Sequence, residues 1–392
     1  MAPIPRTRFG SGPALFSAGF RPFFLLGGVW AAVAIALWLP AYFGELTIAT
    51  ALSPLDWHMH EMLYGYVVAV ITGFLLTAIP NWTGRLPLHG WPLVGLIAVW
   101  LAGRLAMAHS ALIGARVAAA MDLSFLVLVI VVSARELSNG AHNHNKRVLA
   151  ALLVLLAGNA IFHFEAFVEG TADYGVRTGL SAVLVLIMLI GGRIIPSFTR
   201  NWLARENPGP LPAAPSRFDL IAIGAAAVSL FAWTLAPEAP ATGGALIAAA
   251  ALHAIRLLRW RGERTWRDRL VLILHVGYFF VPLGFLLTGL SAFGLTPSSA
   301  GVHVWTIGTI GTMTLAVMTR ASLGHTGRAL IARPGAQAAY ALVIIAALTR
   351  VCAALRPESS AILLIASAVA WVSAFSLFIV GYFGVLTLPR RG

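Results

Sequence analysis

Twelve apolar segments follow one another along the chain, and their length is the feature that most limits how it can fold. They cover residues 18–39, 57–79, 91–109, 116–134, 148–168, 176–198, 218–236, 240–257, 269–292, 301–319, 336–355 and 360–386. A helix of about 20 apolar residues crosses the hydrocarbon core of a bilayer. Only 10% of the residues are charged, too few to cover a soluble globule of this size. We therefore predict an all-α polytopic membrane protein of about twelve transmembrane helices, with residues 1–392 forming a single integral membrane domain.

The net charge of +13, from 27 basic and 14 acidic residues, is distributed unevenly. Twenty basic residues lie in alternate connections or at the adjoining span ends: Arg6, Arg8, Arg85, Arg135, Lys146, Arg147, Arg200, Arg205, Arg217, Arg256, Arg259, Arg261, Arg264, Arg267, Arg269, Arg320, Arg328, Arg333, Arg390 and Arg391. The opposite side has five: Arg104, Arg116, Arg177, Arg350 and Arg356. Because cytoplasmic connections are enriched in Lys and Arg, this asymmetry predicts that both termini are cytoplasmic. The excess of basic residues then reflects the orientation of the chain in the membrane, and we expect no nucleic-acid partner. We also expect no cleavable signal peptide.

The single cysteine, Cys352, limits the possible cofactors. It excludes an internal disulfide, a cysteine-ligated iron–sulfur cluster and a CxxCH haem attachment. A metal in this protein must therefore be held by histidine, carboxylate or methionine.

An internal repeat relates the second and tenth apolar segments. His60-Glu-Met-Leu-Tyr-Gly65 and His303-Val-Trp-Thr-Ile-Gly308 share their first and last residues at an offset of 243, as do Thr83-Gly-Arg85 and Thr326-Gly-Arg328. We interpret this as three pseudo-repeats of four helices, approximately 18–134, 148–257 and 269–386, a plan like that of haem–copper oxidase catalytic subunits. The alternative is a chance match between segments of generic membrane composition.

Four histidines are predicted to share one depth near the outer surface. His58 and His60 begin the second span, His303 begins the tenth, and His163 lies near the end of the fifth. Imidazole is the usual protein ligand of haem iron and copper, and ionisable residues inside a bilayer are usually functional. The alternative is that these histidines cap helix ends without a metal. His89, His109, His142 and His144, by contrast, fall in loops or at span ends and are expected to be solvated.

The geometry of a helix indicates that these histidines serve two different cofactor sites. His58 and His60 are two residues apart and differ by about 200° around a helix, so we expect them to face different cofactors. The repeat favours His60 with His303 as the axial pair of one haem. His58 then serves a second centre, with His163.

Further residues are candidates at other depths. His275 and His325 lie toward the cytoplasmic side and are predicted to form a second metal site or a proton path.

Three arginines near outer span ends are candidates for binding haem propionates, because arginine pairs with carboxylates in a bidentate manner. They are Arg104, Arg177 and Arg350. Snorkelling to the interface is the alternative for these arginines.

Longer motifs give the chain a resemblance to a known family. They are Phe16-Ser-Ala-Gly-Phe-Arg-Pro-Phe-Phe24, Trp57-His-Met-His-Glu-Met-Leu-Tyr-Gly65, Gly73-Phe-Leu-Leu-Thr-Ala-Ile-Pro-Asn-Trp-Thr-Gly-Arg85, Trp100-Leu-Ala-Gly-Arg104 and Gly324-His-Thr-Gly-Arg328. Together they resemble the NnrS family over the whole chain. The resemblance implies a bacterial inner-membrane protein that contains haem and copper and is linked to nitric oxide metabolism and nitrosative-stress resistance. The histidines that it carries over are His58, His60, His163, His275, His303 and His325.

The leading functional hypothesis is a redox enzyme, similar to nitric oxide reductases, that reduces NO to N2O at a haem–metal centre. It would contain one or two haem b groups, with copper or another second metal. Glu61, Tyr64 and Glu165 are the candidate catalytic proton donors. The electron donor would be a quinol or a cytochrome.

Two other functions compete with this hypothesis. The first is a protein that binds haem, copper or NO without turnover, for sensing or nitrosative-stress resistance. A transporter is less favoured, because the leading histidines are predicted to lie in one outer layer and not around a midplane site.

Overall fold

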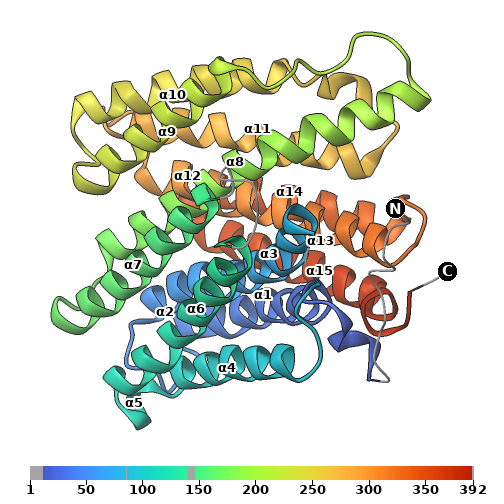
Figure 1. Cartoon of the computed structure of the whole chain (residues 1–392). Coiled ribbons are helices and arrows are strands. Elements are labelled where there is room, and N and C mark those ends of the chain that lie inside the picture. Colours follow the sequence, from blue (N-terminus) through green and yellow to red (C-terminus); the bar gives the residue numbers. More distant parts are fainter. Residues whose placement is uncertain (1–11, 85, 139–145, 391–392) are drawn as a thin grey trace. The chain divides into compact units, whose positions relative to one another are not determined.

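The computed structural model describes residues 12–84, 86–138 and 146–390, and these residues form helices without any strand (Figure 1). Twelve helices among them are long and apolar enough to cross a membrane. The prediction of an all-α polytopic membrane protein with about twelve spans is therefore confirmed. Four arginines of the charge analysis, Arg6, Arg8, Arg85 and Arg391, lie outside the described residues, as do His142 and His144.

The described chain forms two compact units. Unit 1 comprises residues up to 179 together with 321–329 and those from 379 onward, and unit 2 comprises 180–320 and 330–378. Three helices contribute residues to both units, namely α8 (Asp173–Glu206), α13 (Thr312–His325) and α15 (Ser360–Thr387). The single domain with three pseudo-repeats stays a prediction.

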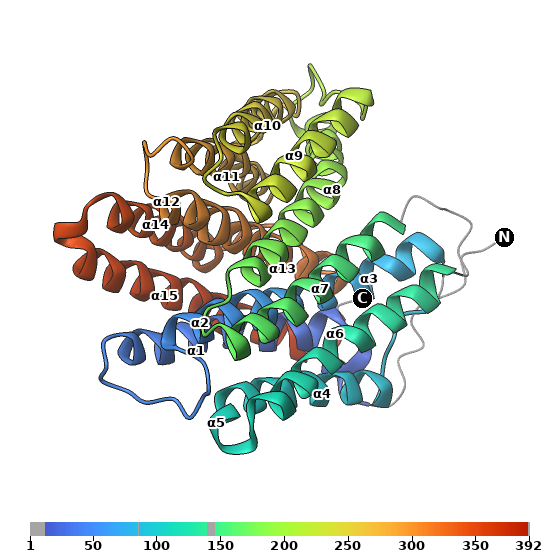
Figure 2. The ribbon, with the colours of Figure 1, turned by 90° about the vertical axis from the view of Figure 1, so that its left-hand side faces the viewer.

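Unit 1 contains the N-terminal helices. They are η1 (Ala14–Ser17), α1 (Phe20–Tyr42), α2 (Pro54–His60), η2 (Glu61–Val67), α3 (Val68–Thr83), α4 (Trp91–Ala108), α5 (Ser110–Ile113), α6 (Ala115–Ser138) and α7 (Lys146–Val168). α1 packs along the continuous span formed by α2, η2 and α3, and α6 packs against α3, α4 and α7 (Figure 2). This packing brings α2, α4, α6 and α7 together around one buried polar cluster.

Unit 2 contains the second half of the spans. They are α9 (Arg217–Leu235), α10 (Pro240–Leu258), η4 (Gly262–Thr265), α11 (Arg269–Ser291), α12 (Ser298–His303), η5 (Val304–Gly311), α14 (Pro334–Leu355) and η6 (Pro357–Ser359), with most of α8, α13 and α15. α11 packs against α10, α12 and η5, and α14 covers α12 and η5 from another side.

Two spans share an unusual backbone. Both η2 and η5 are π-helices that interrupt a longer α-helix, and each begins directly after a histidine, His60 or His303. Each span is followed by a glycine with positive φ: Gly84, at 75°, comes directly after Thr83, and Gly327, at 69°, comes two residues after His325. These features fall at the repeat offset found in the sequence, so the match between the second and tenth spans extends to their backbone conformation.

Candidate metal centre

His60 is the last residue of α2 and is completely buried. α2 has a well-defined start, because Pro54 occupies its first turn and the Ser53 side chain accepts a hydrogen bond from the backbone N–H of Asp56 at 3.1 Å. The helix then widens into η2 at Glu61. π-helical turns are frequent at functional sites, where they redirect side chains.

His60, Asp122 and His163 converge from α2, α6 and α7. The Nε2 atom of His60 lies 3.2 Å from Asp122 Oδ2, and the Nε2 atom of His163 lies 3.1 Å from the same oxygen. One ligand atom from each residue lies within 4.8 Å of the other two, and His60 and Asp122 are buried. Three side chains from separate helices thus present the donor atoms of a metal site to one point.

A second layer of polar residues fixes these three side chains. His60 Nδ1 donates to Glu61 Oε1 at 3.0 Å, and Trp30 Nε1 donates to Glu61 Oε2 at 2.7 Å. Arg104 binds both Glu61 oxygens at 2.7 Å with Nη1, and its Nη2 contacts Asp122. Asn159 Nδ2 donates to Asp122 Oδ2 at 2.7 Å.

The formal charges of the charged side chains in this cluster do not sum to zero. Arg104 contributes one positive charge against the two carboxylates Glu61 and Asp122, all three being buried. An uncompensated charge away from water is costly, so the remaining negative charge must be neutralised. A proton on one carboxyl group, a protonated imidazole or a bound metal ion would each do this.

The donor chemistry fits a metal ion. When His60 is neutral with its proton on Nδ1, which donates to Glu61, its Nε2 has a lone pair, as in metal-ligating histidines that donate their other ring N–H to a carboxylate. A metal ion bound between Nε2 and Asp122 would then replace the second proton that their 3.2 Å contact otherwise needs. Two imidazoles and one carboxylate are a ligand set typical of first-row transition metals such as iron. Asn159 Oδ1 is also buried and has no hydrogen-bond partner among the described residues, which leaves another donor atom at the site.

The same geometry is less suited to haem at His60. Both ring nitrogens of His60 face carboxylates, so an iron–porphyrin could approach only if Asp122 moved away. His60 and His303 belong to different units, each described by itself, and their axial pairing stays a prediction.

His58 faces another direction from His60, as the two-residue spacing predicts. Its ring stacks on Trp38 of α1 with centroids 4.1 Å apart, whereas the His60 ring lies 5.0 Å from that of His163. The structure therefore brings His163 to His60, whereas we paired His163 with His58. The role of His58 in a second centre stays a prediction.

The predicted proton donors Tyr64 and Glu165 contact the first turn of α8. Tyr64 Oη donates to the Gly175 carbonyl at 2.7 Å, and Glu165 accepts from the backbone N–H groups of Tyr174 and Gly175 at 2.9 and 2.7 Å. Glu165 thus satisfies N–H groups that have no partner within their own helix. Together with the bonds of Glu61, these contacts give all three residues a structural role, and their proton donation stays a prediction.

His303 has surroundings unlike those of His60. Its Nδ1 donates to the carbonyl of Ser299 at 2.7 Å, which fixes the tautomer and leaves the Nε2 lone pair available to a metal. Arg350 lies within electrostatic range of His303 in the same unit. These two residues fit the predicted axial ligand and propionate partner of a haem.

The remaining candidates are distributed between the units. In unit 2, Nε2 of His275 lies 2.8 Å from Thr199 Oγ1. In unit 1, His325 packs near the Phe20 ring at 5.5 Å, and Arg177 lies over the Tyr174 ring at 5.0 Å. The joint site of His275 and His325 and the propionate role of Arg177 stay predictions.

The sequence-based site omitted Asp122 and Asn159, which complete the cluster. A signal existed for both, because Asp122 is the one acidic residue of the apolar segment 116–134 and Asn159 lies inside the apolar segment 148–168. Polar residues at such positions are functional candidates in their own right.

Comparison with known proteins identifies the family. The family model described as NnrS protein matches residues 14–390, so the chain belongs to the NnrS family. The family is associated with nitric oxide and, in general terms, with haem and metal binding, which makes this chain a nitric-oxide-associated membrane protein. No curated protein matches the sequence.

Proposed function

Starting from membership of the NnrS family, we propose that the protein reduces nitric oxide to nitrous oxide at a transition-metal centre held by His60, His163 and Asp122. The observation that carries the proposal is the convergence of these three ligands in a buried cluster that lacks one positive charge. The reaction joins two NO molecules and consumes two electrons and two protons, giving N2O and water.

The chain's own residues hold and tune the centre. A bound transition-metal ion supplies a binding position for NO and stabilises developing negative charge. Glu61 orients His60 through the 3.0 Å hydrogen bond to Nδ1 and raises the basicity of the ligand. Arg104 neutralises part of the carboxylate charge, and it also fixes Glu61 and Asp122 relative to each other.

Water is kept away from the cluster by its packing. The rings of Phe162 and Tyr64 lie 5.1 and 5.6 Å from that of His60, and all three side chains are buried. Low polarity around the site strengthens each electrostatic contact inside it. Tyr64, close to His60, is the candidate that we favour for carrying a proton to the centre.

A haem b group fits the proposal at His303 in unit 2. Haem bound there supplies one-electron transfer. His303 would hold the iron through Nε2, because Nδ1 is engaged by Ser299, and Arg350 would bind a propionate. We also propose that the protein lies in the bacterial inner membrane with both termini cytoplasmic, which rests on the distribution of its basic residues.

The test combines metal content with turnover. Purified protein should contain about one transition-metal ion per chain in addition to any haem iron, and should release N2O from NO when an artificial reductant supplies electrons. His163→Ala and Asp122→Ala should lose that ion and the turnover. His109→Ala, which removes an exposed histidine, is the matched control and should keep both.

Two results would redirect the proposal. Metal binding and NO binding without N2O release would favour a non-catalytic role in sensing or resistance. An ion that stays bound in Asp122→Ala and His163→Ala would refute the assignment of this site.

A further inference from the structure

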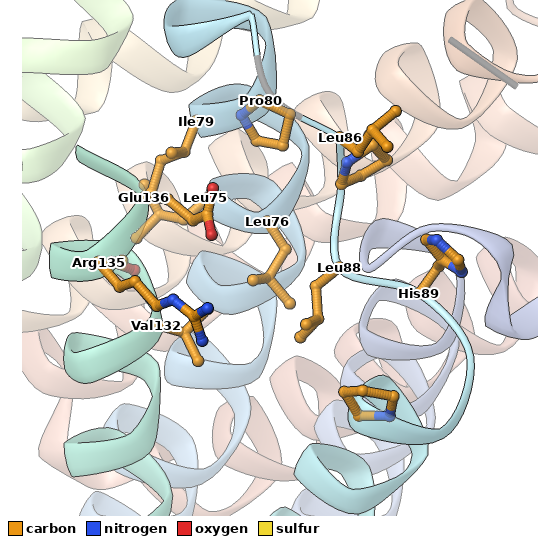
Figure 3. Close-up of a pocket in the computed structure, with 13 residues that line it drawn as sticks. Leu75, Leu76, Ile79, Pro80, Leu86, Leu88, His89, Val132, Arg135 and Glu136 are labelled. Atoms are coloured by element: carbon orange, nitrogen blue, oxygen red, sulfur yellow. The ribbon is translucent and has the colours of Figure 1, made fainter. Parts of the chain in front are cut away.

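Unit 1 contains a cavity of about 440 Å³ between α3, α6 and the connection 86–92 (Figure 3). This volume is within the range of small-molecule binding pockets. The metal ligands do not line it, so the cavity is separate from the metal centre.

The lining of the cavity combines apolar and polar side chains. Its apolar residues include Leu75, Leu76, Ile79, Leu88 and Val132. Figure 3 shows Leu76 and Leu88 side by side in the middle of the pocket, with Arg135 on one side of them and His89 on the other. A ligand that fits must therefore be amphipathic, with an apolar body and a polar group.

The wall of the pocket that α6 forms carries a hydroxyl group without a hydrogen-bond partner among the described residues. Ser133 lines the pocket, is 1% exposed, and its Oγ has no hydrogen-bond partner among the described residues. A buried hydroxyl without a partner is costly, and a serine in a helix usually donates to a carbonyl of the preceding turn. The Ser133 hydroxyl is thus available to a ligand oxygen.

The charges beside Ser133 favour a neutral head group. Arg135 and Glu136 are adjacent and of opposite sign, and both line the pocket. Among the described lining residues these charges cancel, whereas a phosphate head group would require an excess of positive charge. Glu136 and His89 are also side chains that can accept protons.

The pocket lies where the described spans of unit 1 end. α3 ends at Thr83, α4 begins at Trp91, and α6 ends at Ser138, and residues near all three ends line the cavity. Trp91 is 85% exposed, and exposed tryptophan is typical of the membrane–water interface. This places the pocket at the level of the membrane–water interface, where amphipathic lipid-soluble molecules have their polar groups.

α6 connects the pocket to the metal centre. Asp122 and Ser133 are eleven residues apart, which places them on nearly the same face of the helix and about 16 Å apart along its axis. Phe125 lies between them on α6, with its ring 5.7 Å from that of Phe23.

We propose that this pocket binds a membrane quinol, which supplies the electrons for the metal centre. This inference rests on the proposed NO reduction. The quinol's two O–H bonds break, its ring loses two electrons and becomes the quinone, and two NO molecules take up two electrons and two protons to give N2O and water. The Ser133 hydroxyl binds a ring oxygen, the apolar residues hold the tail, and His89 and Glu136 accept the released protons.

Binding is tested with a radiolabelled short-chain benzoquinone, by equilibrium dialysis of the full-length purified protein. Val132→Trp fills the pocket and should weaken binding at least tenfold. Val131→Trp, a neighbouring residue that is 56% exposed and does not line the pocket, should leave binding unchanged. Ser133→Ala removes one hydrogen bond and should weaken binding about fivefold, which gives a second test if Val132→Trp does not fold.

The outcomes separate this inference from the proposed function. Absence of quinone binding, equal binding by the Val132 and Val131 variants, or a co-purified phospholipid that the quinone does not displace would each overturn the quinol site. Pocket-dependent binding supports it, even if an artificial reductant drives no N2O release. That last result would overturn the proposed NO reduction alone.

Discussion

The spans Pro54–Thr83 and Ser298–His325 have the same backbone plan and different side-chain chemistry. Each runs from a short α-helix through a π-helix that begins after a histidine, and each is followed by a glycine with positive φ. The residue after His60 is Glu61, which orients the imidazole and binds Arg104, whereas the residue after His303 is Val304. His303 is instead held by a backbone carbonyl.

This difference shows that one backbone conformation, a π-helix that begins after a histidine, can place histidines in two different polar environments. The π-helix sets where the histidine points, and the neighbouring side chains decide its charge environment. Around His60 the carboxylates favour a small cation, whereas around His303 an uncharged partner leaves an ordinary imidazole ligand, as haem iron requires.

The largest expected effect comes from removing each histidine in turn. His303→Ala should abolish the haem absorption and leave the transition metal of the His60 site in place, because the two imidazoles are proposed to serve different centres. His60→Ala should do the reverse. Optical spectra of both variants measure the haem, and metal analysis measures the transition metal. Loss of the haem signal in both variants would instead support the single axial pair predicted from the repeat.

Removal of Arg104 should cost about 3–5 kcal/mol of folding free energy, because it leaves the buried Glu61 and Asp122 without their cation. The measurement is the free energy of unfolding of Arg104→Ala in detergent. Arg350→Ala, which removes the arginine within electrostatic range of His303, is the control and should cost less, because Arg350 is only half-buried. Equal losses would contradict the difference in charge between the two spans.

Glu61→Gln keeps the shape of the side chain and removes its charge. We expect the affinity for the metal to fall about 10- to 100-fold, the usual effect of losing a partner that orients a ligand. Metal titration of the purified variant measures this change. Val304→Thr, the similarly sized change in the other span, should leave the metal affinity of the His60 site unaltered.

The smallest effects should be equal in the two spans. Gly84→Ala and Gly327→Ala each place a Cβ at positive φ, which costs about 1–2 kcal/mol. Thermal unfolding midpoints of the two variants should therefore fall by similar amounts. A large fall in one and none in the other would indicate that the backbone equivalence ends before the C-terminal cap.

Hydropathy was sufficient to predict the spans. A chain that crosses the apolar bilayer must form its backbone hydrogen bonds internally, so each crossing is a long apolar helix. The predicted segments 57–79 and 301–319 are shorter than the observed spans, which continue into polar ends at both sides. The π-helices themselves have no composition that distinguishes them from α-helix. They were therefore not predicted.

The site was predicted in part for a related reason. His60, His163, Glu61 and Arg104 stood out as polar residues in apolar spans, but the sequence does not state which faces of α2, α4, α6 and α7 meet. Pairing by repeat therefore joined His60 to His303, while the packing of unit 1 joins it to His163 through Asp122. Asp122 could have been found as a lone intramembrane carboxylate.

The buried network of Glu61, Arg104 and Asp122 also has a consequence for the insertion of the spans into the membrane during synthesis. Each of these residues enters the bilayer on a different span, and an unpaired charge within an inserted helix is costly. Glu61 and Arg104 lie on consecutive spans and can enter as a neutral pair. Asp122 follows one span later and restores a net negative charge. During synthesis, the arrival of His163 on the next span, together with a cation, is thus the step that completes a neutral assembly.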